Sequence, residues 1–532
     1  MERGAQMYIQ HIAANDPLTM VVDPDVDGMT SAALFINYTY KLFPAYVQNS
    51  ITYLCHTGKQ HGLNDMKEWI PEDTKFLVMI DSSSNDYECH KYFAEKGVDI
   101  LVIDHHEADK VSEYACVINN QLCGYPNKAL SGVGVAYKFC CYLDNKLGIY
   151  NAYDLEDLVS LGLIADMVDT RTVETRYLIT QGLKDIHNPL IKEIANRNSS
   201  RFEGGITPMG AAFYIAPFIN AVMRSGTLEE KFLLFESLLE HKAYEEIPST
   251  KRGCSGQYET RVEQAARMSS NVKARQKRAQ DSGVEAIERL IQEKNLLDNK
   301  ILFIKIEDSM LDRNLAGLVA NQLVAKYQRP VAILRPTSYL DKPAWGGSMR
   351  GYEKSELKDF RAFLLSTGLV ADCSGHSNAA GLTVYDNDFD ALIDKTNEML
   401  KDIDFSPAYQ VDAIIDYVDL TDNIVFEIAN WGELWGQNVE EPLIAIENVK
   451  ADSNSFALIG TNQKTMRISV PEQRTNFIKF NLSEEEREEL LSSESFNLNI
   501  IGRFALNYYM GSVSPQIQVV DYEIIKQRKW DF

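Results

Sequence analysis

The stretch Asp99-Ile100-Leu101-Val102-Ile103-Asp104-His105-His106 is the part of the sequence from which the fold is most readily inferred. It begins with a short apolar run, rich in β-branched side chains, which predicts a buried strand. One acid and two histidines follow at once, at the position where strands of an open α/β sheet end and where such sheets bind ligands. The triplet indicates a functional site only if further carboxylates reach the same edge.

Further acidic residues follow apolar segments in the first half of the chain. They are Asp23, Asp25 and Asp27 after the predicted strand 18–22, Asp81 after the predicted strand 76–80, and Asp166 at the end of the apolar helix 158–165. Any one of them has an ordinary explanation as a helix cap or a turn residue. Clustered together they would require a cation, because neighbouring carboxylates disfavour one another's charged form.

The chemistry that this set of residues favours is a two-metal phosphoesterase. Two divalent ions about 4 Å apart activate water on one side and hold phosphoryl oxygens on the other. Carboxylate and imidazole ligands suit Mn²⁺ or Mg²⁺ better than metals that bind thiolates. The eight cysteines form no Cys-x-x-Cys pair, and we interpret them as reduced residues rather than zinc ligands.

Length and composition limit the number of domains and the classes of protein to which the chain can belong. A chain of 532 residues predicts several domains at ~150 residues each. No apolar segment reaches the roughly 18 residues of a membrane span, and the start Met1–Gly4 does not resemble a secretory signal, so we expect a cytoplasmic protein without a membrane partner. The net charge of −23 argues against coating nucleic acid by bulk charge, but a nuclease with a local basic groove is compatible with it.

Four segments of the first half resemble motifs one to four of the DHH phosphoesterase superfamily. They are Asp23-Pro24-Asp25-Val26-Asp27-Gly28, Asp81, Asp104-His105-His106 and Asp166. Intervening segments resemble one branch of that superfamily, the RecJ-type single-strand exonucleases. Gly62-Leu63-Asn64 is similar to its YGLN segment, the run 130–136 to LAGVGVA, and the run 161–168 to LGTIADVV. The resemblance covers nearly all of the first half.

The resemblance implies a role for each motif residue. By this resemblance the ligands are Asp25 for one ion, Asp27, His105 and Asp166 for the other, and Asp81 as the bridge between them. Asp23 either binds an ion itself or supports a ligand, and the sequence does not decide between these roles. His106 would face the scissile phosphate, and Asp104 would orient the histidines, as carboxylates behind metal ligands do.

Further segments resemble the substrate-binding parts of the same branch. They are Pro217–Arg224, similar to PRxNAAGR with Met223 in place of glycine, Gly347–Gly351, similar to GSxRS, and Cys373–Gly381, similar to GGHxxAAG with Ser374 in place of glycine. The resemblance implies that Arg224, Ser348 and Arg350 bind a terminal 5′-phosphate. The planar guanidinium group of arginine suits this role because it can bind two phosphate oxygens at once. Gly375 would let backbone amides approach the phosphate closely, and His376 would supply a further hydrogen-bond donor to it.

A long helix is expected between these parts. From about Gln257 to Asn295 there is no proline, and Gly283 is the only glycine. Residues 251–280 carry eight basic and two acidic side chains, a local charge of +6. Arg275 and Arg278 are candidates for following a nucleic-acid backbone, and the alternative is an ordinary solvated helix face.

The C-terminal third begins after a break at Ser406-Pro407 and contains short alternating runs that predict strands. The expected strands are 442–446, 455–459, 465–470, 496–501 and 516–520, with a helix at 483–492. This pattern fits an OB-fold barrel, which RecJ-type proteins carry here after an FGxGNPEP segment that Trp435–Pro442 matches only in part. Phe504, Tyr508 and Tyr509 either stack bases or belong to the core.

We therefore expect an α/β protein of four parts. They are a DHH catalytic domain with a parallel sheet (1–245), a connecting helix (246–299), a smaller α/β DHH-associated (DHHA1) substrate-binding domain (300–405) and an OB-like β-barrel (406–532). The resemblance implies an exonuclease dependent on Mn²⁺ or Mg²⁺ that degrades single-stranded DNA from a 5′-phosphate end to mononucleotides, in DNA repair or recombination. A single-strand-binding protein or a helicase would be its protein partner.

Three alternatives remain open at this stage. One is a DHH phosphodiesterase for short oligonucleotides or cyclic dinucleotides, and another is a type II inorganic pyrophosphatase. The long helix and the extra β domain argue against both, because such small substrates need no groove of that length. The third is a scaffold without catalysis, against which the complete set of motif carboxylates argues.

Overall fold

The computed structural model of the chain describes residues 1–58, 60–406, 408–452, 454–460, 462–469, 474–492, 495–509 and 511–525. It comprises two compact units, one of residues 1–223, 227–267 and 410–532 and one of residues 224–226 and 268–409. Pro407 and Val470, which belong to the expected boundary and to an expected strand, lie outside the described residues. Over the described part of the chain, every helix is too short or too polar to span a bilayer.

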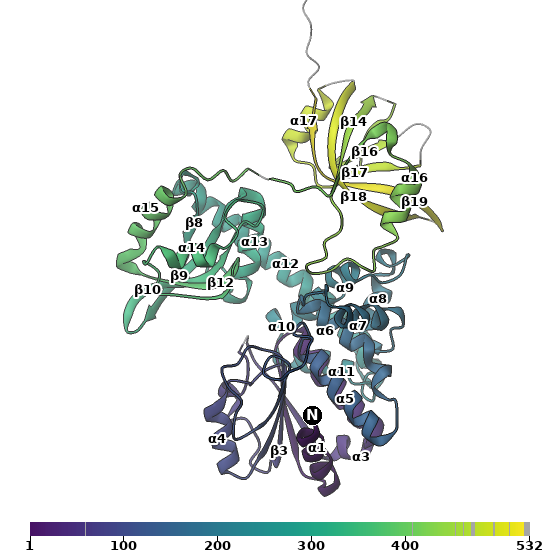
Figure 1. The fold of residues 1–532 in the computed structure, drawn as a ribbon, viewed down its shortest axis with the longest axis vertical. Coiled ribbons are helices and arrows are strands. Elements are labelled where there is room, and N and C mark those ends of the chain that lie inside the picture. Colours follow the sequence, from purple (N-terminus) through teal and green to yellow (C-terminus); the bar gives the residue numbers. More distant parts are fainter. Residues whose placement is uncertain are drawn as a thin grey trace, which may run out of the picture. The chain divides into compact units, whose positions relative to one another are not determined.

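The first unit contains a fully parallel sheet, of which β3 is labelled in Figure 1. Its strands lie in the order β2-β1-β3-β4-β5. Its strands are β1 (Leu18–Val22), β2 (Ile51–Cys55), β3 (Phe76–Ile80), β4 (Asp99–Asp104) and β5 (Cys116–Asn119). Every residue of β1 and β3 is buried, which explains why both are continuous apolar runs. The strands expected at 18–22, 76–80 and 99–103 are confirmed. This strand order belongs to doubly wound sheets that bind ligands between the first and third strands.

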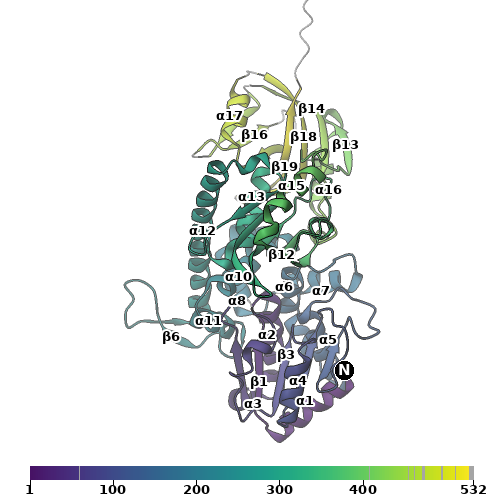
Figure 2. The ribbon, with the colours of Figure 1, turned by 90° about the vertical axis from the view of Figure 1, so that its left-hand side faces the viewer.

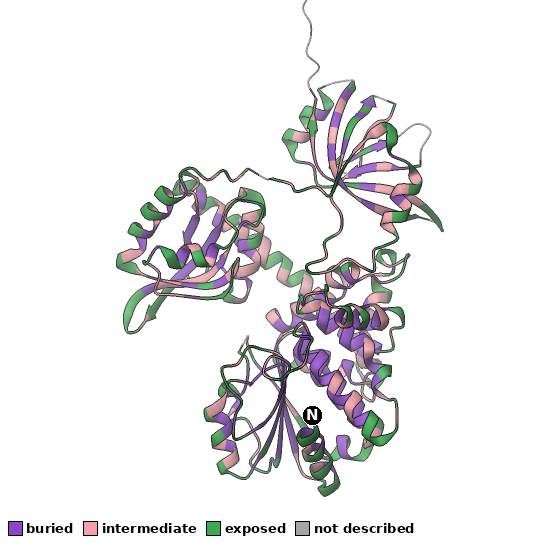
Figure 3. Ribbon diagram, in the orientation of Figure 1, coloured by how far each residue is buried: buried purple, intermediate pink, exposed green. Residues whose placement is uncertain are grey.

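Helices cover both faces of this sheet. They are α1 (Glu2–Ala14), α2 (Val26–Leu42), α3 (Pro44–Ser50), α4 (Tyr87–Glu95) and α5 (Gly132–Leu147). Cys89 and Phe93 of α4 belong to the core on one face. Tyr8 of α1 meets Phe35 of α2 and Phe139 of α5 edge to face, with ring centroids 5.6 and 6.0 Å away. The central strands β1, β3 and β4 are almost wholly buried between these layers, whereas the edge strand β2 is partly exposed (Figure 3).

A helical region follows the sheet. It comprises α6 (Glu156–Ala165), α7 (Val173–Lys184), α8 (Pro189–Arg197), α9 (Pro208–Tyr214), α10 (Ala216–Ser225) and α11 (Leu228–Leu238). Local signals set where these helices begin. Asn188 caps α8 ahead of Pro189, and Thr227 forms a capping box with Glu230 at the start of α11. The expected apolar helix at 158–165 is α6, and Asp166 is its C-cap.

The connecting segment differs from the expectation at its start. A two-stranded hairpin, β6 (Glu246–Pro248) and β7 (Tyr258–Thr260), precedes α12 (Arg261–Glu293), which is one uninterrupted helix (Figure 2). Gly253 and Gly256 adopt positive φ angles of 82° and 81° in the hairpin loop, a conformation incompatible with a right-handed helix. Residues 258–260 pair with β6, so the helix begins at Arg261 and occupies only part of the expected connecting segment 246–299.

The second unit contains a five-stranded sheet in the order β11-β12-β10-β9-β8, in which only β8 and β9 pair in parallel. The elements are β8 (Leu302–Lys305), α13 (Ala316–Tyr327), β9 (Val331–Tyr339), β10 (Lys342–Arg350), α14 (Phe360–Ser366), β11 (Asp372–His376), β12 (Ala379–Tyr385) and α15 (Phe389–Met399). Ile287 of α12 and Val319 of α13 belong to one core cluster, and Phe360 of α14 and Leu392 of α15 to another. The expected smaller α/β domain is thus present.

Residues 410–525 form a mixed sheet in the order β13-β14-β18-β19-β17-β16-β15. The elements are β13 (Ala413–Asp416), α16 (Asp422–Ala429), β14 (Ile444–Asp452), β15 (Phe456–Ile459), β16 (Thr465–Ser469), β17 (Asn476–Lys479), α17 (Glu484–Leu491), β18 (Ser495–Tyr509) and β19 (Ser512–Ile524). β18 and β19 form a hairpin far longer than the expected runs. Phe504 is a core residue with 2% exposure, whereas Tyr509 is 66% exposed.

Candidate metal centre

The junction of β1 and α2 positions the first acidic motif. Asp23 follows the last residue of β1, and 1% of its surface is exposed. Asp25 is the N-cap of α2, and its Oδ1 accepts a hydrogen bond from the amide of Gly28 at 2.9 Å. A Cβ atom on Gly28 would lie 2.4 Å from the Cβ of Asp23, so this tight turn requires glycine. Burial raises the pKa of Asp23 to about 6.

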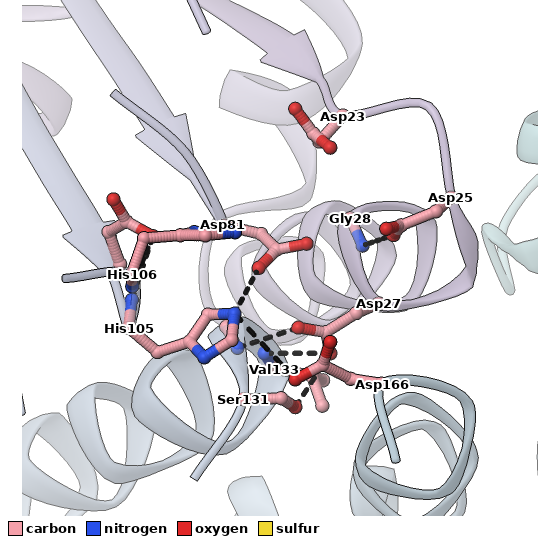
Figure 4. A network of polar contacts seen from close by, with 12 residues as sticks. Asp23, Asp25, Asp27, Gly28, Asp81, His105, His106, Ser131, Val133 and Asp166 are labelled. Atoms are coloured by element: carbon pink, nitrogen blue, oxygen red, sulfur yellow. Dashed lines mark hydrogen bonds and ion pairs between the residues drawn. The ribbon is translucent and has the colours of Figure 1, made fainter. Parts of the chain in front are cut away.

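Asp27 is held by the start of α5, far away in the sequence. Its carboxylate accepts hydrogen bonds from Ser131 Oγ at 2.8 Å, from the amide of Gly132 at 2.6 Å and from the amide of Val133 at 3.2 Å (Figure 4). The N-terminus of a helix stabilises negative charge through its free amides and its dipole. The α5 N-terminus therefore fixes the position of this carboxylate.

Asp81 occupies the end of β3 in a left-handed backbone conformation. Its φ angle is 66°, which is uncommon for a residue other than glycine, and it is 2% exposed. Burial first, and then the charges of Asp27, Asp25 and Asp23, raise the pKa of Asp81 well above its ordinary value. Such a group stays ionised at neutral pH only where positive charge is supplied nearby.

His105 lies between two of the acids. Its Nε2 is 3.1 Å from Asp81 Oδ1 and 3.7 Å from Asp166 Oδ2 (Figure 4). The side chain of Asp166 is 30% exposed, so this acid is more open to solvent than its apolar helix suggested. Burial, together with Asp27 and Asp25, raises the pKa of Asp166 to about 8. Burial lowers the pKa of His105 and thereby favours the neutral imidazole that binds metals.

His106 is hydrogen-bonded to Asp104, and its ring is half-exposed to solvent. Its Nδ1 lies 2.8 Å from Asp104 Oδ1, and 53% of its side chain is exposed. Asp104 is fully buried and also accepts hydrogen bonds from the amides of Ser84, His105 and His106 at 3.0, 2.7 and 3.2 Å. The hydrogen bond to Asp104 raises the pKa of His106 to about 9. The arrangement holds a cationic imidazole at the surface of the site.

The acids and histidines form three overlapping groups in which one potential ligand atom from each residue lies within 4.8 Å of the others. The groups are Asp23, Asp25 and Asp81; Asp27, His105 and Asp166; and Asp81, His105 and His106. Asp81 and His105 each belong to two of them. The structure thus brings together all the residues that the sequence predicted as metal ligands.

Two buried oxygens test whether these residues fit a metal. Within the described residues, Asp23 Oδ1 and Asp81 Oδ1 have no hydrogen-bond partner. The contact of Asp81 Oδ1 with His105 at 3.1 Å is an ion-pair distance without hydrogen-bond geometry. Buried carboxylate oxygens without donors are costly, and a divalent cation would satisfy them. Oxygen ligands with one or two imidazoles fit Mn²⁺ or Mg²⁺.

The predicted phosphate-binding side chains of the second unit share one face of its sheet. Arg350 of β10 and His376 of β11 both pair with Ala379 of the intervening β12, while Ser348 of β10 pairs with Gly381 two positions along. Because side chains alternate along strands, Ser348, Arg350 and His376 lie on the same face. The small residues of β12 leave that face open between them.

Two glycines, Gly317 and Gly375, allow close contacts near these side chains. A Cβ atom on Gly317 of α13 would lie 2.3 Å from Arg350 Nη2, so the guanidinium packs directly on that helix. Burial, and then the nearby charge of Arg224, lower the pKa of Arg350, which places the two arginines within electrostatic reach. Gly375 has a φ of 133°, and a Cβ there would lie 2.8 Å from the backbone of Ala380.

Ion pairs neutralise part of the local positive charge of residues 251–280. Lys251 and Arg267 both pair with Glu259, and Lys277 pairs with Asp281. Arg261 pairs with Glu236 and Glu245, which precede this segment in the sequence. Arg275 and Arg278 are exposed, and Arg275 Nη2 donates to the carbonyl of Ser225 at 3.0 Å.

Sequence reasoning missed one residue beside the centre. His61 Nδ1 lies 2.7 Å from Asp23 Oδ2. The available signal was its position directly before Gly62-Leu63-Asn64, the segment that resembles YGLN.

Comparisons with known proteins agree with this arrangement. Residues 19–163 match the family model "DHH family, N-terminal domain", and residues 411–521 match "RecJ OB domain". The "Putative SPbeta prophage-derived single-strand DNA-specific exonuclease YorK" of Bacillus subtilis (strain 168) is 37% identical over 99% of this chain and 91% of its own length. The "Single-stranded-DNA-specific exonuclease RecJ" of the same strain is 25% identical over 100% of this chain and 64% of its own length.

A solved structure supports the same fold. RecJ of Thermus thermophilus in complex with Mn²⁺ superposes with a TM-score of 0.71 at 17% identity, over 99% of this chain and 72% of that chain. The sheet-edge cluster of acids and histidines is that of a DHH-family protein. Within that class, the chain belongs to the RecJ family, whose relatives are named as exonucleases specific for single-stranded DNA.

Proposed function

We propose that this chain is an exonuclease that degrades single-stranded DNA from its 5′ end to mononucleotides, with two Mn²⁺ or Mg²⁺ ions. The observation that carries the proposal is the set of three overlapping ligand groups, in which Asp81 is common to the Asp23–Asp25 pair and to the histidines. The names of the RecJ relatives support the substrate. The Mn²⁺ and Mg²⁺ complexes of Thermus thermophilus RecJ support the choice of metals.

The proposed ligands follow from the groups. They are Asp25 with Asp23 for one ion, Asp27, His105 and Asp166 for the other, and Asp81 as the bridge. The bound ions supply an activated water and neutralise charge on the phosphodiester. The chain's own contribution is orientation: α5 holds Asp27, while Asp104 holds His106 with its ring facing outward toward the scissile phosphate.

The proposed site for the 5′-phosphate lies on the second unit. Arg224 and Arg350 supply positive charge, and Ser348 and His376 supply donors on the same sheet face as Arg350. At Gly375 the absence of a side chain would let the backbone approach the phosphate closely. Arg275 and Arg278 would follow the strand further along α12.

The division into parts that accompanies this function is the one expected from the sequence. It assigns 1–245 to catalysis, 246–299 to the connection, 300–405 to substrate binding and 406–532 to further nucleic-acid binding. DNA repair or recombination in the cytoplasm, beside a single-strand-binding protein or a helicase, is the proposed setting. The eight free cysteines support a reducing compartment.

The test uses single-stranded DNA labelled at its 3′ end, incubated with the chain and Mn²⁺. Degradation from the 5′ end yields labelled fragments that shorten progressively, and this is the expected result. Immediate release of the label as a mononucleotide would overturn the polarity. A 5′-phosphate should be cleaved faster than a 5′-hydroxyl, and equal rates would count against the Arg224, Ser348 and Arg350 assignment. Cleavage restricted to dinucleotides would favour the short-oligonucleotide alternative.

A further inference from the structure

The loop between β2 and β3 brings a third histidine to the metal centre. His61 Nδ1 lies 2.7 Å from Asp23 Oδ2. The imidazole is 58% exposed, whereas the carboxylate that it contacts is 1% exposed. The roles proposed for the DHH motif residues do not include this histidine.

The first part of this loop is anchored by a buried lysine. Lys231 of α11 is 1% exposed, and its Nζ donates hydrogen bonds to the carbonyls of His56 at 3.1 Å and Thr57 at 2.9 Å. A buried ammonium group costs free energy unless such acceptors surround it. These hydrogen bonds hold the start of the loop against α11.

The second part of the loop is anchored by Asp86, which lies close to the end of β3. Its carboxylate accepts hydrogen bonds from the amide of Leu63 at 2.7 Å and from Asn64 Nδ2 at 3.2 Å. Gly62 has a φ of 75°, and a Cβ there would lie 2.5 Å from Asp86 Oδ2. His61 directly precedes this fixed turn, so its position beside Asp23 is set by contacts on both sides of the loop.

The pair His61–Asp23 has the same construction as the pair His106–Asp104. In both, Nδ1 of a half-exposed imidazole contacts a carboxylate that is 1% exposed, at 2.7 and 2.8 Å. Hydrogen bonds of this kind fix the ring and the carboxylate relative to each other. Among the described residues, the centre therefore carries two aspartate–histidine pairs of this construction, and His106–Asp104 is the one that belongs to the DHH triplet.

The two oxygens of Asp23 face different partners. Oδ2 contacts His61, whereas Oδ1 is buried and, among the described residues, has no hydrogen-bond partner. Asp23, Asp25 and Asp81 each offer a ligand atom within 4.8 Å of the others. A carboxylate held by one oxygen presents the other in a fixed direction, which is what a metal ligand requires.

We propose that His61 is a positioning residue of the metal centre, which fixes Asp23 through Nδ1 so that the other carboxylate oxygen binds an ion. This inference rests on the proposed function, because it assigns Asp23 as a direct ligand of that same site. His61 directly precedes Gly62-Leu63-Asn64, the segment that resembles YGLN. Loss of such a supporting contact typically weakens metal binding by about 10- to 100-fold.

The experiment measures Mn²⁺ binding directly, by titration calorimetry and by the electron paramagnetic resonance signal of free Mn²⁺. The full chain is compared with His61→Ala, His61→Asn and the control His187→Ala. An asparagine amide can replace the Nδ1 donor but not Nε2. His187 is also half-exposed and contacts an aspartate, Asp185, at 3.4 Å, away from the acids of the proposed metal centre.

The expected result is that His61→Ala weakens one of two Mn²⁺ affinities by about tenfold or more, while His61→Asn restores most of it and His187→Ala leaves both unchanged. Unchanged Mn²⁺ affinity in His61→Ala, with the melting temperature intact, would overturn the inference. Equal losses in His61→Ala and His61→Asn would also overturn it, because the Nδ1 contact would then not be the cause.

The nuclease assay separates this inference from the proposed function. An unmodified chain that binds two Mn²⁺ ions but does not cleave DNA would defeat the proposed function and leave the role of His61 standing. An active chain whose Mn²⁺ affinity does not depend on His61 would defeat the inference alone.

Discussion

Gly132, the first residue of α5, lies so close to Asp81 that a Cβ atom on it would stand 2.5 Å from Asp81 Oδ1. The amide of the same glycine donates to Asp27 Oδ2 at 2.6 Å. One residue of a helix N-terminus thus contacts two carboxylates, one at the end of β3 and one in the first turn of α2. The spacing of these carboxylates is set by α5 as much as by the sheet.

Gly132→Ala should therefore displace Asp81 and impair catalysis without unfolding the chain. A misplacement of about 1 Å in a catalytic group can cost on the order of 100-fold in rate, and we expect a loss of that size in Mn²⁺-dependent cleavage. Gly124→Ala is the matched control, because a Cβ there meets nothing within 4 Å. Equal activity of the two variants, at equal circular dichroism, would contradict the close approach.

Asp81→Asn should abolish cleavage and stabilise the metal-free chain. Burial and the neighbouring acids raise the pKa of Asp81 in the folded chain, so at neutral pH folding must either protonate this carboxyl or bear its charge beside other acids. Asparagine avoids that cost and tolerates the left-handed backbone. We expect the melting temperature in EDTA to rise by about 2–4 °C, roughly 1 kcal/mol. Asp185→Asn, at an exposed site, serves as the control. Substantial residual nuclease activity in Asp81→Asn would refute the bridging role.

Added Mn²⁺ should stabilise the folded chain, because it relieves the repulsion among these carboxylates. At 100 times its Kd, a ligand that binds only the folded state adds about 2.7 kcal/mol to the free energy of unfolding. Differential scanning calorimetry in EDTA and in Mn²⁺ measures this gain. The gain should be much smaller for Asp81→Asn, and an equal gain in both chains would show that the ion binds elsewhere.

Gly317→Ala should alter the preference for the 5′ end while leaving stability nearly unchanged. The new Cβ would lie 2.3 Å from Arg350 Nη2, and the end of an arginine side chain can move at little cost. We expect the ratio of rates on 5′-phosphate and 5′-hydroxyl DNA to fall about tenfold, as loss of a phosphate-binding fork predicts. The rate on 5′-hydroxyl DNA is the internal control. An unchanged ratio would separate Arg350 from 5′-phosphate recognition.

Much of the catalytic core could be predicted from the sequence. The strands at 18–22, 76–80 and 99–103 are continuous apolar runs because helices cover both faces of the sheet. Their acids converge because the carboxyl ends of adjacent parallel strands meet at one edge, whatever the loops do. The grouping of Asp81 with both the first motif and His105 follows from that geometry.

Other features escaped prediction because they depend on residues far apart in the chain. Residues 251–280 carry a local surplus of positive charge, but Glu236 and Glu245, which precede them in the sequence, pair with Arg261. The hairpin of β18 and β19 exceeded its apolar runs because backbone pairing continues where the side chains become polar and exposed.

The sequence by itself determined the buried strands, the acids that follow them and the family to which the chain belongs. These features could be predicted because an apolar run and the acid that follows it are properties of neighbouring residues. Only the tertiary structure decided how these acids are held. Asp27 is bound by the start of α5, Asp23 by His61, and the loop of His61 by Lys231 of α11. Such contacts depend on packing between distant elements, and no periodicity in the chain records them.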